Sequence, residues 1–177
     1  MTAPRFAEQL NEQIGNEFAA HQQYVACAIH YDALTMPQMA AFFYAQALEE
    51  RDHAMMMVQY LLDADEPVQI PGVSAPQVDF PDVVAPIALA LDQERRVTEQ
   101  INALAAVARN ENDYTSEQFM QWFIKEQVEE VATMSDLLRV VARSRESPMD
   151  VETWMAREHG GGEAADPTAP RPAGSGA

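Results

Sequence analysis

The sequence has one cysteine, no long apolar run and few basic residues, and each scarcity excludes a class of protein. A lone thiol, Cys27, cannot form an internal disulfide, so covalent cross-links do not stabilise the fold. The longest apolar run extends only from Val83 to Leu91 and contains Pro86, which is too short for a membrane span. The first residues lack the apolar segment of a secretion signal, so we expect a cytoplasmic protein.

Basic residues are scarce relative to acidic ones. Lys and Arg number 11 against 28 Asp and Glu, which gives a formal net charge of −17. Such a charge repels nucleic acid and anionic membranes and attracts cations. Apolar residues make up 47% of the 177 positions, which is enough for one domain with a proper core.

Proline is absent from long stretches of the chain, and these stretches predict helices. We expect them over about 5–34, 36–64, 86–110 and 115–144, with a shorter helix over 148–158. Two of the starts, Thr35 to Gln38 and Thr115 to Gln118, fit the capping box, in which a hydroxyl and a Gln satisfy free backbone N–H groups. No alternation typical of a strand is present.

The segment 65–85 separates the second and third predicted helices. Helices of about 28 residues are roughly 42 Å long, and 21 extended residues reach up to ~70 Å. The segment can therefore run the whole length of a bundle and make these two helices parallel. We predict an all-α fold with four bundled helices, one long crossover and a short fifth helix. The domain would cover 1–159, followed by a flexible Gly/Pro/Ala-rich tail over 160–177.

Each of the four long helices carries a polar residue within its apolar stripe. Glu17, Glu50 and Glu94 interrupt the first three stripes, Gln127 interrupts the fourth, and Glu130 lies at its edge. Burying ionised carboxylates costs several kcal/mol each. Either these carboxylates are protonated or a cation lies between them, and none of the stripes contains Lys or Arg. A metal cluster is the natural remedy, whereas a merely solvated polar face fits the stripes poorly.

The spacing of these residues repeats. Glu17 and Glu50 are 33 residues apart, as are Glu94 and Gln127, and His53 and Glu130 each follow three positions later. Residues at i and i+3 share a helical face, so each of these pairs can point at one site. Ligands rich in oxygen, with an imidazole, favour iron or manganese over structural zinc.

The residues Glu17, Glu49-Glu50-Arg-Asp-His53, Glu94 and the segment from Gln121 to Glu130 resemble the bacterial non-haem ferritins over about 5–158. The resemblance implies one iron held by Glu17, Glu50 and His53, and a second held by Glu50, Glu94 and Glu130, with Gln127 beside them. It implies a third iron site at Glu49, Glu126 and Glu129, and it places Tyr24 and Trp122 near the centre. The catalytic set would be Glu17, Tyr24, Glu50, His53, Glu94 and Glu130.

The resemblance also implies an activity. Members of this family oxidise Fe(II) with oxygen, a ferroxidase activity, and store the product as a ferric mineral inside a homo-oligomeric shell of 24 subunits. Bacterioferritins are similar, but they carry a haem-binding Met where this chain has Arg51, and a His in place of Glu130. We therefore do not expect haem.

Two other functions are compatible with the pattern. One is a soluble di-iron peroxidase or oxygenase of the same fold, and the other is a structural bundle that binds no iron tightly. Two residue roles are open as well. Gln127 either touches metal or only hydrogen-bonds a ligand, and Tyr24 is either a redox partner or part of the core.

Overall fold

The helices of this computed structural model lie where the sequence predicts them. It describes residues 2–159 and 166–175, and in this part of the chain there are helices and no strands. Each predicted boundary is within one residue of the observed one. The helices are α1 (Pro4–Ala33), α2 (Pro37–Asp63), α3 (Ala85–Asn110), α4 (Tyr114–Arg143) and α5 (Pro148–Glu158). None of the described helices is long and apolar enough to cross a membrane.

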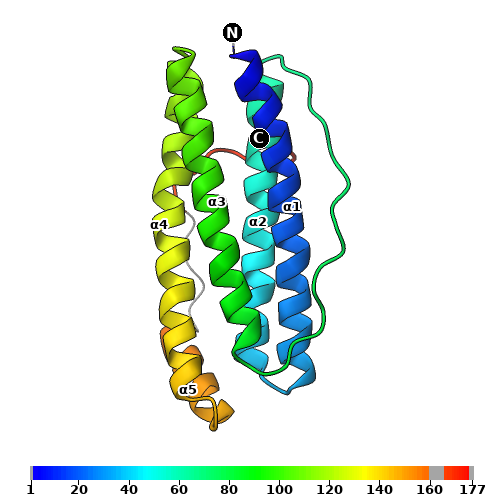
Figure 1. The fold of residues 1–177 in the computed structure, drawn as a ribbon, viewed down its shortest axis with the longest axis vertical. Coiled ribbons are helices and arrows are strands. Elements are labelled where there is room, and N and C mark those ends of the chain that lie inside the picture. The colour runs from blue at the N-terminus through cyan, green and yellow to red at the C-terminus, as the bar shows by residue number, and fades with distance from the viewer. Residues whose placement is uncertain (1, 160–165, 176–177) are drawn as a thin grey trace.

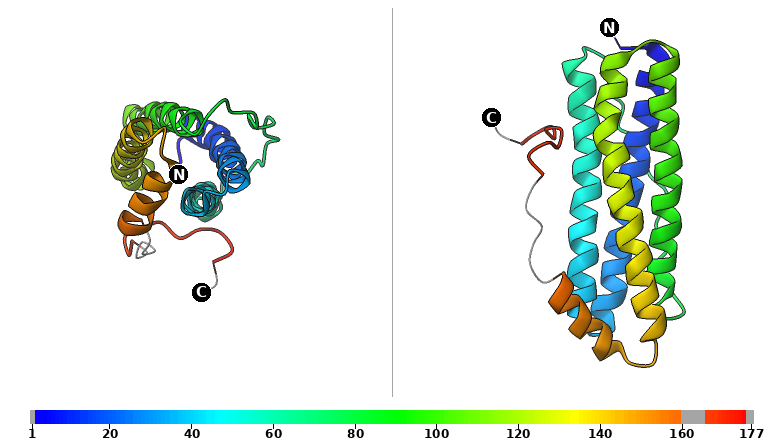
Figure 2. Two further views of the ribbon diagram at one scale, coloured as in Figure 1. Left: turned by 90° about the horizontal axis from the view of Figure 1, so that it is seen from below. Right: turned by 90° about the vertical axis from the view of Figure 1, so that its left-hand side faces the viewer.

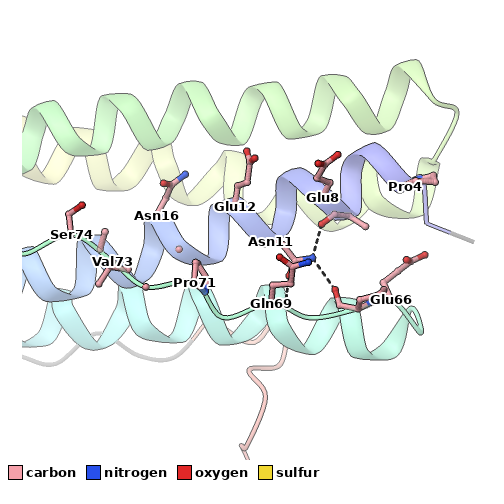
Figure 3. A pocket seen from close by; sticks show the side chains of 15 residues that line it. Pro4, Glu8, Asn11, Glu12, Asn16, Glu66, Gln69, Pro71, Val73 and Ser74 are labelled. Carbon is pink, nitrogen blue, oxygen red and sulfur yellow. Dashed lines mark hydrogen bonds between the residues drawn. The ribbon is translucent and has the colours of Figure 1, made fainter.

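Helices α1 to α4 lie side by side as a bundle, and α5 packs at one end (Figures 1 and 2). The chain between α2 and α3 runs in extended form along the whole bundle, so these two helices are parallel, as predicted (Figure 1). Side chains of α1 hold this crossover. Asn11 donates to the Pro67 carbonyl at 3.0 Å and accepts from the Gln69 N–H at 2.6 Å (Figure 3). Gln23 makes a similar pair of hydrogen bonds with Gln77, both 2.9 Å long.

The predicted capping box at the start of α2 is wrong. Thr35 adopts a positive φ of 59° in the turn, and its side chain does not cap the helix. The free N–H groups of Gln38 and Met39 instead donate to the Glu152 carboxylate of α5, at 2.8 and 3.1 Å. A residue more than 100 positions away in the sequence thus caps α2, which explains why no local pattern predicted it.

The second predicted capping box, at Thr115 to Gln118, is also wrong. The N-cap of α4 is Asp113, whose carboxylate accepts hydrogen bonds from the Ser116 N–H at 3.1 Å and the Ser116 hydroxyl at 2.6 Å. The same carboxylate accepts from the Ala3 N–H at 2.9 Å and so ties the N-terminus to this end of the bundle.

Two apolar clusters fill the bundle, and the buried carboxylates lie on helices that both clusters share. One cluster includes Tyr31 and Phe43 and extends to α5, and the other includes Leu10 and Phe123. The apolar stripe predicted for α4 included Val131 and Leu138, with Glu130 at its edge, and the buried face observed in the second half of the helix is different. Glu130 and Leu137 are buried, while Val131 and Leu138 are partly exposed. Glu130 is therefore a core residue and does not lie at the edge of the stripe.

Part of the C-terminal tail lies against the bundle. The Ala173 N–H donates to the Met55 carbonyl at 2.9 Å. The Asp166 carboxylate accepts from the Trp122 indole N–H and from the Lys125 ammonium, both at 3.2 Å. Residues 166–175 thus contact both α2 and α4 (Figure 2). The rest of the tail expected to be flexible, 160–165 and 176–177, lies outside the described residues.

Candidate metal centre

Side chains from all four long helices converge in the interior of the bundle. Glu17 comes from α1, Glu50 and His53 from α2, Glu94 from α3, and Gln127 and Glu130 from α4, and all six are buried. Glu17 and Glu94 are only 1% exposed. Among the residues that the structure describes, no Lys or Arg is buried. Within the described part of the chain, the carboxylates therefore have no Lys or Arg in the core to neutralise them.

Three of these side chains already form a group that suits a metal ion. One ligand atom from each of Glu17, Glu50 and His53 lies within 4.8 Å of the others. His53 Nδ1 is 3.5 Å from Glu50 Oε2. Two carboxylates and one imidazole are a ligand set that iron accepts.

Glu94 lies next to this group and is held from two sides. The Tyr24 hydroxyl donates to Glu94 Oε1, and Gln127 Nε2 donates to Glu94 Oε2 at 3.0 Å. The Tyr24 ring packs edge-on against Phe43, with the ring centres 5.7 Å apart. Both oxygens of Glu94 thus accept hydrogen bonds, and the Tyr24 side chain combines core packing with contact to a candidate ligand.

The buried carboxyl groups resist ionisation. Burial raises the pKa of Glu17 above its ordinary value, and burial together with the charge of Glu94 raises the pKa of Glu50 well above it. Burial raises the pKa of Glu94 from 4.5 to about 7. Negative charge also acts on Glu50 from Glu17 and Glu130, so the four carboxyl groups are electrostatically linked. A divalent cation at this point would remove the repulsion.

His53 is held neutral. Burial lowers its pKa from 6.5 to about 4, so the imidazole keeps a lone pair for a metal near neutral pH. Its ring lies edge-on to Trp122 and Phe123, with the ring centres 5.6 and 5.9 Å apart. Trp122 therefore does lie at the site, in contact with a candidate ligand.

A cavity of about 490 Å³ opens beside this centre, between α2, α4 and α5. Its lining includes the three acids expected for a third iron site, Glu49, Glu126 and Glu129, together with Glu130. Glu129 is exposed and lies 3.8 Å from the Lys125 ammonium. Glu130 is the residue that the cavity and the buried centre have in common.

Two glutamines at this site were not predicted as functional residues. Gln13 donates to Glu17 Oε1 at 2.8 Å, and Gln46 donates to Glu49. The sequence did contain a signal for Gln13, because it lies four positions before Glu17 within the same apolar stripe. His21, which shares a helical face with Glu17, is not part of the metal group, and its ring nitrogen lies 2.6 Å from the Ala47 carbonyl.

Comparison with known proteins agrees with the fold. The ferritin-like domain family matches residues 7–144. The chain is 54% identical to a protein named ferritin BfrB from Mycolicibacterium smegmatis over 170 residues, which cover 96% of this chain and 93% of that protein. It is 34% identical over 143 residues to a bacterial non-heme ferritin from Staphylococcus aureus, with 81% of this chain and 86% of the relative covered.

A solved structure is similar over the same region. An open pore ferritin from the archaeon Archaeoglobus fulgidus superposes with a TM-score of 0.85 at 25% identity, covering 89% of this chain and 97% of the other. The matched family spans all four bundle helices, and these helices supply every residue of the buried centre. The chain belongs to the ferritin family.

Proposed function

We propose that this protein is a ferroxidase and an iron store. It would oxidise Fe(II) with oxygen at the buried centre and keep the product as a ferric mineral inside a homo-oligomeric shell of 24 subunits. One observation carries the proposal. Four carboxyl groups and a neutral imidazole converge in an apolar bundle, and no buried Lys or Arg among the described residues compensates their charge.

Glu17, Glu50 and His53 are the proposed ligands of the first Fe(II). Their ligand atoms lie within 4.8 Å of one another, so little rearrangement is needed to surround one ion. Because burial holds the pKa of Glu50 well above its usual range, this group must lose a proton when the metal enters. Binding of the first ion should therefore release protons and weaken as the pH falls.

The second Fe(II) would be held by Glu50, as the bridging ligand, together with Glu94 and Glu130. Both Glu94 oxygens accept hydrogen bonds, from Tyr24 and Gln127, and each keeps a second lone pair that can bind the metal. Gln127 already contacts Glu94, and this supports a role in holding that ligand.

Oxidation takes one electron from each of the two Fe(II) ions, which are substrates here, and passes them to oxygen. The chain's own contribution is to hold both ions close together with anionic ligands, which stabilise the additional positive charge of Fe(III). Tyr24 would act through its hydroxyl on Glu94. Fe(III) would then leave towards the cavity lined by Glu49, Glu126 and Glu129, the proposed third iron site.

Haem has no part in this proposal. Arg51, which stands at the position of the haem-binding Met of bacterioferritins, is exposed and pairs with Asp52 at 2.6 Å. The net charge of −17 supports an attraction for Fe(II) over nucleic acid or anionic lipid. We place the protein in the cytoplasm, as expected from the sequence.

Aerobic titration with Fe(II) tests the proposal. The purified protein is separated by size after each addition, and the iron in each fraction is counted per chain. Iron far above three per chain, eluting with a particle of several hundred kilodaltons, is the expected result. Saturation at two or three on a small oligomer would overturn storage and favour a peroxidase or oxygenase. Glu50→Gln, which removes the bridging charge with little change of shape, should abolish rapid oxidation while the shell still assembles.

A further inference from the structure

Glu17 is held by an amide that is itself held in place. Gln13 lies one turn before Glu17 on α1, is only 2% exposed, and donates from Nε2 to Glu17 Oε1 at 2.8 Å. The Gln13 carbonyl oxygen accepts from Asn16 Nδ2 at 3.1 Å. An amide turned the other way would set its oxygen against the Glu17 carboxylate and its NH₂ against the NH₂ of Asn16. The contacts with Glu17 and Asn16 together favour the amide orientation in which Gln13 donates to Glu17.

The two oxygens of Glu17 have different surroundings. Oε1 is occupied by Gln13, while Oε2 is buried and accepts no hydrogen bond from an amide, hydroxyl or ring N–H among the described residues. Besides Gln13, the carboxyl group of Glu50 lies within hydrogen-bonding reach of Glu17. A buried acceptor without a hydrogen-bond partner destabilises the fold. A cation bound to Glu17 Oε2 would remove this destabilisation.

The neutral charge of the Gln13 amide matters as well. Gln13 fixes the carboxylate with a neutral N–H, so Glu17 keeps its full negative charge for a cation. A Lys or Arg in the same place would hold it equally well but would neutralise it. Gln127 holds Glu94 in the same way, and so does Gln46 for Glu49. Neutral carboxamides thus orient three carboxylates around the centre without competing with the metal.

We propose that Gln13 is a positioning residue for the first metal ion. Gln13 fixes Glu17 Oε1, leaves Oε2 directed at the ion, and is itself oriented by Asn16. Asn16 lies at the surface of α1, in the pocket beside the crossover, so the chain of contacts leads from solvent to the metal ligand (Figure 3). The inference rests on the proposed function, because it assumes that Glu17 binds metal.

The test replaces Gln13 by a residue of similar size without an amide, Gln13→Met, in the full chain. The matched control is Gln23→Met, the same change on the same helix. Gln23 is also buried, but its amide holds the crossover at Gln77, away from the metal centre. The probe is Co(II), which reports ligand geometry through its visible absorption and needs no oxidation step. Titrations followed by absorption and by calorimetry give the affinity and the spectrum of the first ion.

Loss of a hydrogen bond to a metal ligand typically costs 10- to 100-fold in metal affinity. Gln13→Met should weaken the first Co(II) by about that factor and change its spectrum. Gln23→Met should bind Co(II) as the wild type does, even if its melting temperature falls. Asn16→Leu, a change nearer the surface, should weaken the first Co(II) to a smaller extent.

Three results would overturn the inference. The first is wild-type affinity and spectrum for Gln13→Met, or for Asn16→Leu if Gln13→Met does not fold. The second is an equal loss in Gln13→Met and Gln23→Met, which would trace the effect to the fold of α1 in general. The third is an absence of Co(II) binding by the wild type. That result removes the proposed function as well, so the two failures can be told apart.

Discussion

Replacing Glu94 by glutamine should make the metal-free protein progressively more stable, relative to the wild type, as the pH rises from 5 to 8. Glu94 is 1% exposed, and burial raises its pKa from 4.5 to about 7. A group whose pKa is raised by folding contributes most below its unfolded pKa and loses that contribution as the pH rises through the folded value. The contribution of Glu94 should therefore fall between pH 4.5 and about pH 7. Glu94→Gln carries no such charge and should escape the loss.

The size of the effect follows from these two pKa values. Each pH unit between them corresponds to about 1.4 kcal/mol, so the full loss is roughly 3 kcal/mol. Most of it falls between pH 5 and pH 8, where we expect the free-energy difference between variant and wild type to shift by roughly 2–3 kcal/mol in favour of the variant. For a chain of this length that is about 5–10 °C in melting temperature.

A difference in free energy of unfolding that is the same at every pH does not disturb this test. A glutamine at position 94 would set its NH₂ against that of Gln127 and so lose a hydrogen bond, but this cost does not vary with pH. His53 acts in the opposite direction. Its pKa is lowered to about 4, so its contribution is present above pH 6.5 and is lost as the pH falls towards 4. Because both proteins contain His53, its effect cancels in the difference.

The assay is thermal unfolding by calorimetry, in chelator, at several values from pH 5 to pH 8. Glu99→Gln, on an exposed position of the same helix, is the control and should follow the wild type at every pH. Saturating Co(II) should reverse the order, because Glu94→Gln has lost a proposed ligand. A difference between Glu94→Gln and wild type that stays constant from pH 5 to pH 8, or that shifts against the variant, would refute the reasoning.

Three further outcomes can be checked on the same protein. His53→Ala should lose the first Fe(II) in anaerobic equilibrium dialysis, because it removes the only imidazole of the proposed ligand set; wild-type binding would contradict the ligand assignment. Tyr24→Phe keeps the ring but loses the hydrogen bond to Glu94, so chemical denaturation should show a free energy of unfolding lower by about 1 kcal/mol. Gly15→Ala would place a Cβ 2.6 Å from Pro71 Cγ. Displacing the crossover should cost about 1–3 kcal/mol. This exceeds the gain in helix propensity, which is at most ~1 kcal/mol, so the melting temperature should fall. A raised melting temperature would show that Pro71 can move aside at little cost.

Most of the architecture could be predicted from local signals. Long proline-free stretches marked the helices to within one residue, and the length of the crossover made α2 and α3 parallel. The convergence of Glu17, Glu50 and His53 also followed from spacing, because residues in register along apolar stripes must meet in the core. The cost of burying these charges makes a cation their natural partner.

What the local signals could not predict depends on contacts between distant residues. The Glu152 carboxylate caps α2 only because α5 folds back to that end of the bundle. Glu130, not Val131, is buried because the exact rotation of α4 against its neighbours decides which side of its stripe faces inward. Asp166 meets Trp122 although the tail has the composition of a flexible segment.

The sequence by itself determined the helices, the parallel crossover and the set of acids that enter the core, because helix periodicity and the cost of burying charge act through positions along one chain. Only the tertiary structure decided how each acid is held. Gln13 contacts an oxygen of Glu17, and Gln127 and Tyr24 contact the oxygens of Glu94. These contacts, and the oxygen that is left for a metal, depend on distances of about 3 Å between side chains. Spacing along the sequence places residues on a common face, but it does not specify such distances.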